Sequence, residues 1–129
     1  MATEQVGDIV FQHRQPGASR NAIAQFSEAT EDPNPIHVDL AFANACGFPQ
    51  VIAQGPMTTA HFARLLAQRY GTARLRVLDL TFTAPVFPDE PLVLTATVAK
   101  VGDLTLDLTA AKLDGTVTAR GVAQIGAQS

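Results

Sequence analysis

The sequence predicts an α+β fold in which an antiparallel sheet curves around one long helix. Apolar residues recur at helical spacing in several segments between residues 19 and 70, whereas from residue 74 onwards they alternate with polar residues as in strands. The longest helical segment, residues 56–70, is apolar over a wide face, which suits a helix wrapped by a sheet. Helices gathered on one face of an antiparallel sheet define the α+β class. A chain of 129 residues fits one domain, which we assign to residues 1–129.

The first half is predicted to hold an extended segment and two short helices. Residues 9–13 alternate apolar and polar side chains, which favours a short strand or an extended arm. Ser19 is a suitable N-cap for a helix that ends before Pro33, because proline disfavours helical geometry in the residue before it. Asp39 is placed to cap a second short helix, and Gly47 is placed to close it.

The long helix is predicted to begin at a Gly-Pro pair. Pro56 suits the first helical position because its missing N–H has no partner there, and Gly71 marks the end. Apolar and small residues surround so much of the helix that we expect burial on more than one side.

Strands account for the second half of the chain. A change in the phase of alternation near Leu78 predicts a β-bulge. Asp114-Gly115 is typical of a two-residue hairpin turn. The four predicted strands are residues 74–82, 92–101, 104–113 and 116–125.

Composition narrows the class of protein. A net charge of −3 and scattered basic residues argue against a nucleic-acid partner. The single cysteine, Cys46, fits a reducing compartment, and we expect it to be a buried structural thiol. The N-terminus lacks the features of a signal peptide, and no apolar run approaches the roughly 20 residues that span a bilayer. We therefore expect a cytoplasmic protein without a membrane partner.

One cluster of residues points to chemistry. Asp32, Asn34 and His37 fall within six residues, and Pro33 and Pro35 restrict the backbone between them. A carboxylate beside an imidazole can hold a water molecule and move protons at neutral pH. The alternative is an ordinary turn with a solvated histidine. The helix that starts near Gly55 adds unpaired N–H groups able to stabilise a developing enolate, which favours the catalytic interpretation.

These residues resemble a known family. D-P-N-P-I-H at 32–37 resembles the D-x-N-P-[LI]-H signature of MaoC-like (R)-specific enoyl-CoA hydratases and the related 3-hydroxyacyl-ACP dehydratases. V-I-A-Q-G-P-M-T-T at 51–59 resembles the family's I-A-H-G-M-x-T/S segment, and residues 78–92 resemble its strand-and-turn phrase. The resemblance covers residues 20–125, which is most of the chain.

The resemblance implies a hot-dog fold, normally dimeric, and the reversible syn addition of water to a trans-2-enoyl thioester to give the (3R)-hydroxyacyl thioester. It implies that Asp32 and His37 activate the water and move the proton, and that Asn34 orders the loop and contacts the catalytic groups. It implies that the Gly55 N–H polarises the thioester carbonyl. It also implies that CoA or acyl-carrier protein carries the acyl group and that no metal or redox cofactor is needed. The neighbouring residues expected to contact substrate are Gln54, Pro56, Met57 and Thr58.

The chain departs from the family pattern at three positions. Gln54 replaces the usual histidine before the helix glycine, which we expect to alter a supporting hydrogen bond without abolishing catalysis. Pro56 stands where methionine is common, so one N–H is missing near the carbonyl and Gly55 gains importance. Glu31 replaces a small residue, and we expect a plain surface charge, although a second carboxylate beside Asp32 could raise its pKa.

Two other functions stay open at this point. Hot-dog proteins also include thioesterases, although the D-x-N-P-x-H motif points away from that activity. The chain could also be a partner-dependent or non-catalytic subunit of a dehydratase complex, which Gln54 and the low share of charged residues, 16%, allow. A homodimer is the expected assembly, with a hetero-oligomer as the alternative.

Overall fold

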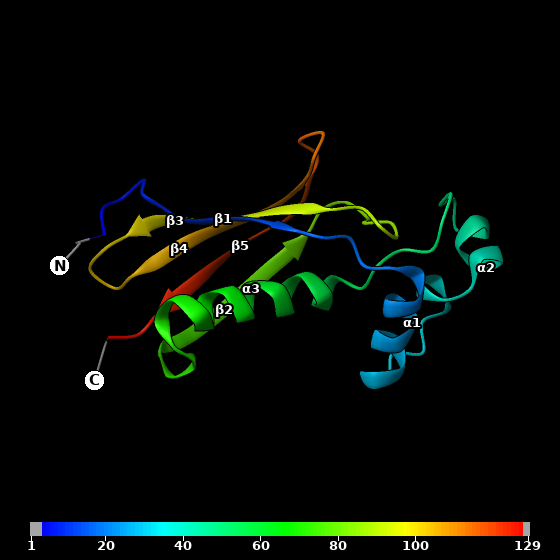
Figure 1. Ribbon diagram of the computed structural model, residues 1–129, viewed down its shortest axis with the longest axis horizontal. Helices are drawn as coiled ribbons and strands as arrows, with labels where there is room; N and C mark the ends of the chain where they lie inside the picture. The colour runs from blue at the N-terminus through cyan, green and yellow to red at the C-terminus, as the bar shows by residue number, and fades with distance from the viewer. Residues whose placement is uncertain (1–3, 128–129) are drawn as a thin grey trace.

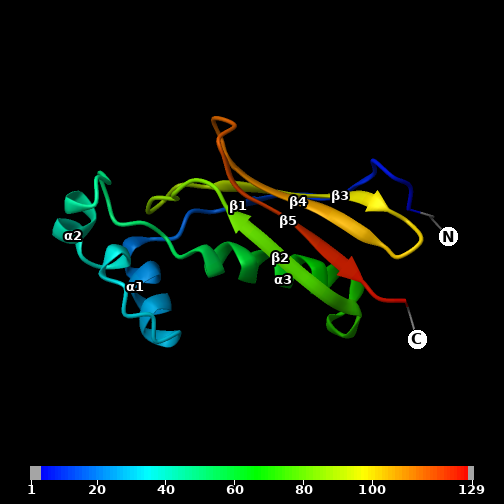
Figure 2. The same cartoon turned by 180° about the vertical axis from the view of Figure 1, so that it is seen from behind.

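A computed structural model describes residues 4–127 of the chain. Five antiparallel strands form one sheet in the order β1-β3-β4-β5-β2, and helix α3 lies along one face of it (Figure 1). Helices α1 and α2 lie beyond the N-terminal end of α3, as both views show (Figures 1 and 2). The elements are β1 (Ile9–Gln15), α1 (Arg20–Ala29), η1 (Pro35–His37), α2 (Leu40–Ala45), α3 (Gly55–Tyr70), η2 (Thr72–Arg74), β2 (Leu75–Phe82), β3 (Leu92–Lys100), β4 (Thr105–Lys112) and β5 (Val117–Ile125).

The core lies between the sheet and α3. Alternate residues of the central strands are buried because successive side chains of a strand point to opposite faces. They pack with Phe62, Leu66 and Tyr70 of the helix. The buried strand residues include Leu92, Leu94, Ala96 and Val98 of β3 and Leu106, Leu108 and Ala110 of β4.

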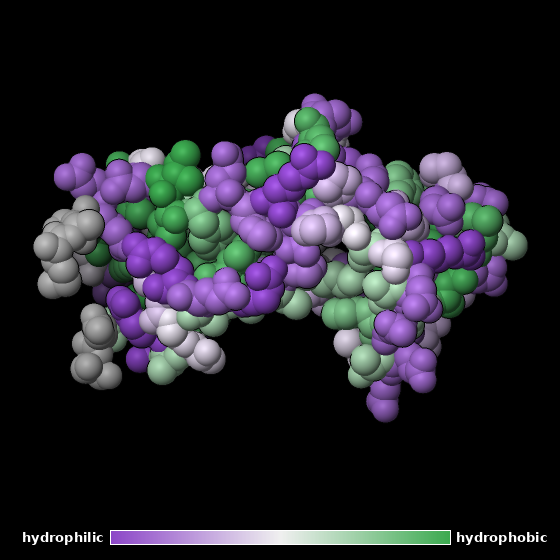
Figure 3. All heavy atoms as spheres, viewed as in Figure 1, coloured by the Kyte–Doolittle hydropathy of each residue, from purple (hydrophilic) through white to green (hydrophobic). Residues whose placement is uncertain are grey.

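Helix α3 is buried along one face of this chain. Its buried residues recur every fourth position, at Thr58, Phe62, Leu66 and Tyr70. The opposite side is exposed and includes Arg64, and a hydrophilic band follows the C-terminal half of the helix (Figure 3). The expectation of burial on more than one side is therefore wrong for the single chain, because small residues such as alanine widened the apolar face without being covered.

The helix ends follow local sequence. The Ser19 side chain accepts a hydrogen bond from the Ala22 N–H at 3.0 Å, and Asp39 accepts one from the Phe42 N–H at 3.1 Å, which confirms both predicted N-caps. Helix α3 begins one residue earlier than predicted, at Gly55. The first helical position thus belongs to glycine, and proline occupies the second.

Three local predictions need correction. The irregularity in β2 lies between Leu75 and Val77, before Leu78. The β4–β5 hairpin has a three-residue loop, because the Lys112 N–H donates to the Thr116 carbonyl at 2.8 Å and encloses residues 113–115. Gly115 takes the left-handed conformation (φ 92°) that such a loop requires. The thiol of Cys46 is exposed, because the residue caps the exposed end of α2.

Among residues 4–127, every helix is too short or too polar to span a lipid bilayer.

Gly121 is predicted to tolerate no side chain. It pairs with Leu80 of β2 and Leu108 of β4, and a Cβ there would lie 1.9 Å from the Asp79 carbonyl oxygen. Gly121→Ala should lower the free energy of unfolding by about 3 kcal/mol or more, because backbone must move. Urea unfolding measures the change. Gly102→Ala, where a Cβ meets nothing within 4 Å, is the matched control and should change little; equal effects would contradict the close approach.

Tyr70 is predicted to lower the free energy of unfolding as the pH rises into the alkaline range. Its hydroxyl donates to a Glu4 carboxylate oxygen at 2.9 Å, and burial followed by this bond raises the pKa of Tyr70 to about 12. The unfolded pKa is about 10, so the contribution of Tyr70 is complete below that pH and is lost as pH rises through about 12.

Tyr70 is the only tyrosine and the chain has no tryptophan, so near-ultraviolet absorbance follows this one phenol. Tyr70→Phe should weaken the loss of stability in this pH range. Titration of the folded protein at an ordinary tyrosine pKa would contradict the burial of the hydroxyl.

Candidate functional site

The loop that carries Asp32 and His37 is built by local hydrogen bonds. After α1 the chain turns at Glu31, whose side chain is exposed and whose backbone is left-handed (φ 54°). The Asp32 N–H donates to the Ser27 carbonyl at 2.9 Å. An Asp32 carboxylate oxygen accepts from the Asn34 N–H at 3.0 Å, and the Asn34 side chain accepts from the Ile36 N–H at 3.1 Å. Asn34 thus takes part in two local hydrogen bonds of this loop, one through its backbone N–H and one through its side-chain oxygen.

His37 faces Asp32 with one ring nitrogen and the chain before α3 with the other. Nδ1 lies 2.7 Å from the Ile52 carbonyl oxygen, and Nε2 lies 3.5 Å from Oδ2 of Asp32. A carbonyl oxygen only accepts, so Nδ1 carries the hydrogen and Nε2 of the neutral ring carries a lone pair. Two acceptors thus face each other across 3.5 Å. This arrangement can bind a donor with two O–H bonds, such as water, and can accept its proton.

Residues 52–55, the linking segment, connect His37 to the start of α3. The Ile52 N–H donates to the Ile36 carbonyl at 3.2 Å, beside the bond from the Ile52 carbonyl to His37. The Ala53 N–H donates to the Val86 carbonyl at 2.8 Å. Within residues 4–127 the Gly55 N–H has no hydrogen-bond acceptor, as is usual in the first turn of a helix. An unpaired N–H at this end of a helix attracts developing negative charge.

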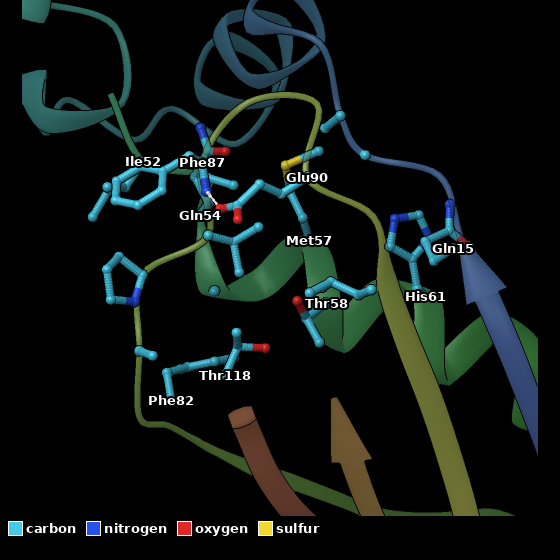
Figure 4. A pocket seen from close by; sticks show the side chains of 18 of the residues that line it. Gln15, Ile52, Gln54, Met57, Thr58, His61, Phe82, Phe87, Glu90 and Thr118 are labelled. Carbon is cyan, nitrogen blue, oxygen red and sulfur yellow. Dashed lines mark hydrogen bonds between the residues drawn. The ribbon is translucent and has the colours of Figure 1, made fainter. Parts of the chain in front are cut away.

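A cavity of about 400 Å³ lies beside the linking segment. The wall includes the predicted site residues His37, Gln54, Gly55, Met57 and Thr58, whereas Asp32 and Asn34 are outside it and Pro56 is exposed. Figure 4 shows Ile52 and Gln54 at one end of the cavity and Gln15 with His61 at another. The apolar wall residues include Phe48, Ile52, Ala53, Met57, Phe82, Val86, Phe87 and Leu92.

Several wall residues were not assigned to the site from sequence. Glu90 lies in the wall, where one of its oxygens accepts from the Phe87 N–H at 2.7 Å and pairs with Lys112 Nζ at 3.0 Å. Lys112 Nζ also lies 4.8 Å from the centre of the Phe87 ring. This cluster holds the 84–91 loop against β4. Residues 78–92 resemble the corresponding strand and turn of the family, but nothing in the sequence indicated that their side chains line a cavity.

His61 of α3 also lies in the cavity wall. Burial lowers the pKa of His61 most, and the nearby charges of Arg64 and His13 lower it further. A neutral imidazole at this position can offer one donor and one acceptor to the cavity.

Gln54 points into the protein. Its side chain is buried at 3% exposure, and Nε2 donates to the Ile23 carbonyl at 2.9 Å and to the Ser27 hydroxyl oxygen at 2.5 Å. Its Oε1 has no hydrogen-bond donor in the described part of the chain. Within residues 4–127 no three His, Cys, Asp or Glu side chains are grouped to hold a metal ion.

The sequence is similar to one protein family and to known hydratases and dehydratases. Residues 4–119 match the family model described as MaoC like domain. The (R)-specific enoyl-CoA hydratase of Aeromonas caviae is 36% identical over 67 residues, or 50% of this chain and 50% of that protein. The mitochondrial 3-hydroxyacyl-[acyl-carrier-protein] dehydratase of Arabidopsis thaliana is 30% identical over 95 residues, or 73% of this chain and 56% of that protein. The matched region thus spans about half the length of these relatives.

Solved structures share the fold. The (R)-hydratase from A. caviae involved in PHA biosynthesis superposes with a TM-score of 0.83 at 24% identity, over 99% of this chain and 100% of that chain. The ChsH1-ChsH2 complex from Mycobacterium tuberculosis gives a TM-score of 0.83 at 17% identity, over 96% of this chain and 98% of that chain. These neighbours confirm the predicted hot-dog fold, and at such identities the likeness concerns the fold alone.

The contact between Gly55 and Phe82 makes a testable prediction. A Cβ on Gly55 would lie 2.7 Å from the Phe82 ring, so Gly55→Ala should lower the free energy of unfolding by about 1 kcal/mol as the ring is displaced. In a Phe82→Ala background the same change should become neutral or stabilising, because alanine favours helix more than glycine does. Urea unfolding of the four proteins measures this cycle. An equal loss in both backgrounds would refute the contact.

Proposed function

Because the chain belongs to the MaoC-like dehydratase family, a family of hydro-lyases, we propose that it catalyses the reversible hydration of a trans-2-enoyl thioester to the (3R)-3-hydroxyacyl thioester. One observation carries the proposal. The bond from His37 Nδ1 to the Ile52 carbonyl leaves Nε2 as an acceptor 3.5 Å from Oδ2 of Asp32, where the two groups can share one water molecule.

In the hydration direction, the water donates one O–H to His37 and the other to Asp32. The water oxygen bonds to C3 of the substrate as one proton passes to the Asp32–His37 pair, and the pair returns a proton to C2. Oxygen and hydrogen arrive from the same face because one pair handles both, so the addition is syn. Dehydration is the reverse of each step.

The N-terminus of α3 supplies the second half of the chemistry. Negative charge develops on the thioester oxygen as water adds, and a fixed N–H aimed at that oxygen lowers the barrier. The Gly55 N–H is unpaired among the described residues, and Pro56 has no N–H to contribute. We therefore assign carbonyl polarisation to Gly55, with Met57 and Thr58 in contact with the acyl group.

The mainly apolar cavity beside these groups suits an acyl chain. The carrier of that chain in this proposal is CoA or acyl-carrier protein. Water addition needs no redox cofactor, and the charge is handled by Asp32, His37 and a backbone N–H, so we propose catalysis without a metal.

The protein is proposed to act as a dimer. Strand β2 lies at an edge of the sheet, and its Val77 and Phe82 are exposed, at 38% and 47%. An exposed edge strand with apolar side chains is a surface that another chain can cover. A second copy is the simplest partner. A different subunit is the alternative, favoured by the complexes named among the structural neighbours, ChsH1-ChsH2 and HadBC.

Substitution of the catalytic pair tests the function. Asp32→Asn and His37→Ala should each lower kcat for crotonyl-CoA hydration by about 10²–10⁴-fold, because each removes an acceptor for the water. Loss of enoyl absorbance measures the rate, and chiral analysis of the product measures its (3R) configuration. Asp103→Asn, at a residue whose side chain is 95% exposed, and His13→Ala on β1 are the matched controls and should stay active.

Two results would indicate a different function. Release of free thiol without hydration would indicate a thioesterase. Hydration that appears only after a second subunit is added would indicate a partner-dependent subunit. Unchanged activity in both the Asp32 and His37 variants would refute the assignment of the pair.

A further inference from the structure

Gln54 occupies the N-cap position of α3, yet its side chain makes no bond to that helix. Its amide nitrogen donates instead to the Ile23 carbonyl and the Ser27 hydroxyl of α1. The Ile23 carbonyl only accepts, so the orientation of the amide is determined: Nε2 faces α1 and Oε1 faces away. The residue directly before Gly55 is thereby bonded to the helix that leads into the Asp32 loop.

Ser27 continues this connection to Asp32. Its hydroxyl accepts from Gln54 Nε2, and its carbonyl accepts from the Asp32 N–H at 2.9 Å. His37 is held separately, by the Ile52 carbonyl. The position of Asp32 relative to His37 and Gly55 therefore depends on how α1 sits against the linking segment, and Gln54 is the side chain that bonds the two.

We propose that Gln54 is a positioning residue that sets the distance from the Asp32 carboxylate to His37 Nε2 and to the Gly55 N–H. Its catalytic consequence rests on the proposed hydration. A misplacement of about 1 Å in a reacting group can lower a rate about 100-fold, so control of this distance matters for kcat more than for binding.

The hydrogen bonds of Gln54 predict that its loss affects the position of α1 more than the stability of the fold. Gln54 Oε1 is buried without a donor in the described chain, and a buried acceptor in that state lowers stability. The Ser27 hydroxyl stands four residues after Ile23 in α1, so it can donate to the Ile23 carbonyl when Nε2 is removed. Loss of the amide should thus cost little stability, while α1 becomes free to shift.

Two substitutions at Gln54 test this, with Gln68→Leu on the exposed side of α3 as the matched control. Gln54→Leu should lower kcat by about tenfold or more, with KM and the thermal midpoint near those of the wild type. Gln54→Glu keeps the shape but cannot donate when ionised. Its activity relative to the wild type should rise as pH falls, because the protonated acid regains a donor towards Ile23.

Hydrogen exchange gives a readout independent of activity. In Gln54→Leu the Asp32 amide should exchange faster, while amides of β3 and β4 keep their protection. If the wild type hydrates no enoyl thioester, the proposed function fails and the exchange of Asp32 still decides the positioning. Unchanged kcat and unchanged Asp32 exchange would overturn the inference. A fall in the thermal midpoint with general loss of protection would overturn it too, by showing a structural role.

Discussion

The hydrogen bond between His37 Nδ1 and the Ile52 carbonyl is the contact on which the candidate site depends. It spans 2.7 Å and joins the loop after α1 to the segment that leads into α3. Because a carbonyl oxygen has no proton to give, this one bond decides that Nδ1 carries the hydrogen and that Nε2 of the neutral ring carries the lone pair. It also holds His37 and the start of α3 in one unit, since the Ile52 N–H is bonded to the Ile36 carbonyl.

The sheet supports that unit from the other side. The linking segment is bonded through Ala53 to Val86, and the 84–91 loop is held in turn by the pair of Glu90 with Lys112. Gly17 lies so close to the same loop that a Cβ would meet the Asp89 backbone at 2.2 Å. The cavity is therefore lined by segments far apart in sequence, and a shift of any of them would move the wall relative to His37.

Much of the fold could be predicted because its signals are local. The capping bonds of Ser19 and Asp39 span three residues, so the sequence shows both partners side by side. The hairpin after β4 shows the limit of such signals: Asp114-Gly115 marks a turn, but the register of β4 and β5 decided that Leu113 joins the loop. The width of the apolar face of α3 likewise led to the wrong prediction that the helix is buried on more than one side, because alanine fits both a buried and an exposed position.

The sequence by itself determined the backbone turns within residues 32–37, because two prolines, an Asx turn and an Asn cap all act within six residues. Only the tertiary structure decided that Gln54 turns towards α1, 27 and 31 residues away along the chain, and that Glu90 and His61 share one cavity. Those contacts follow from sheet register and helix packing. They join residues that are far apart in the chain, so the sequence around one residue does not predict its partner.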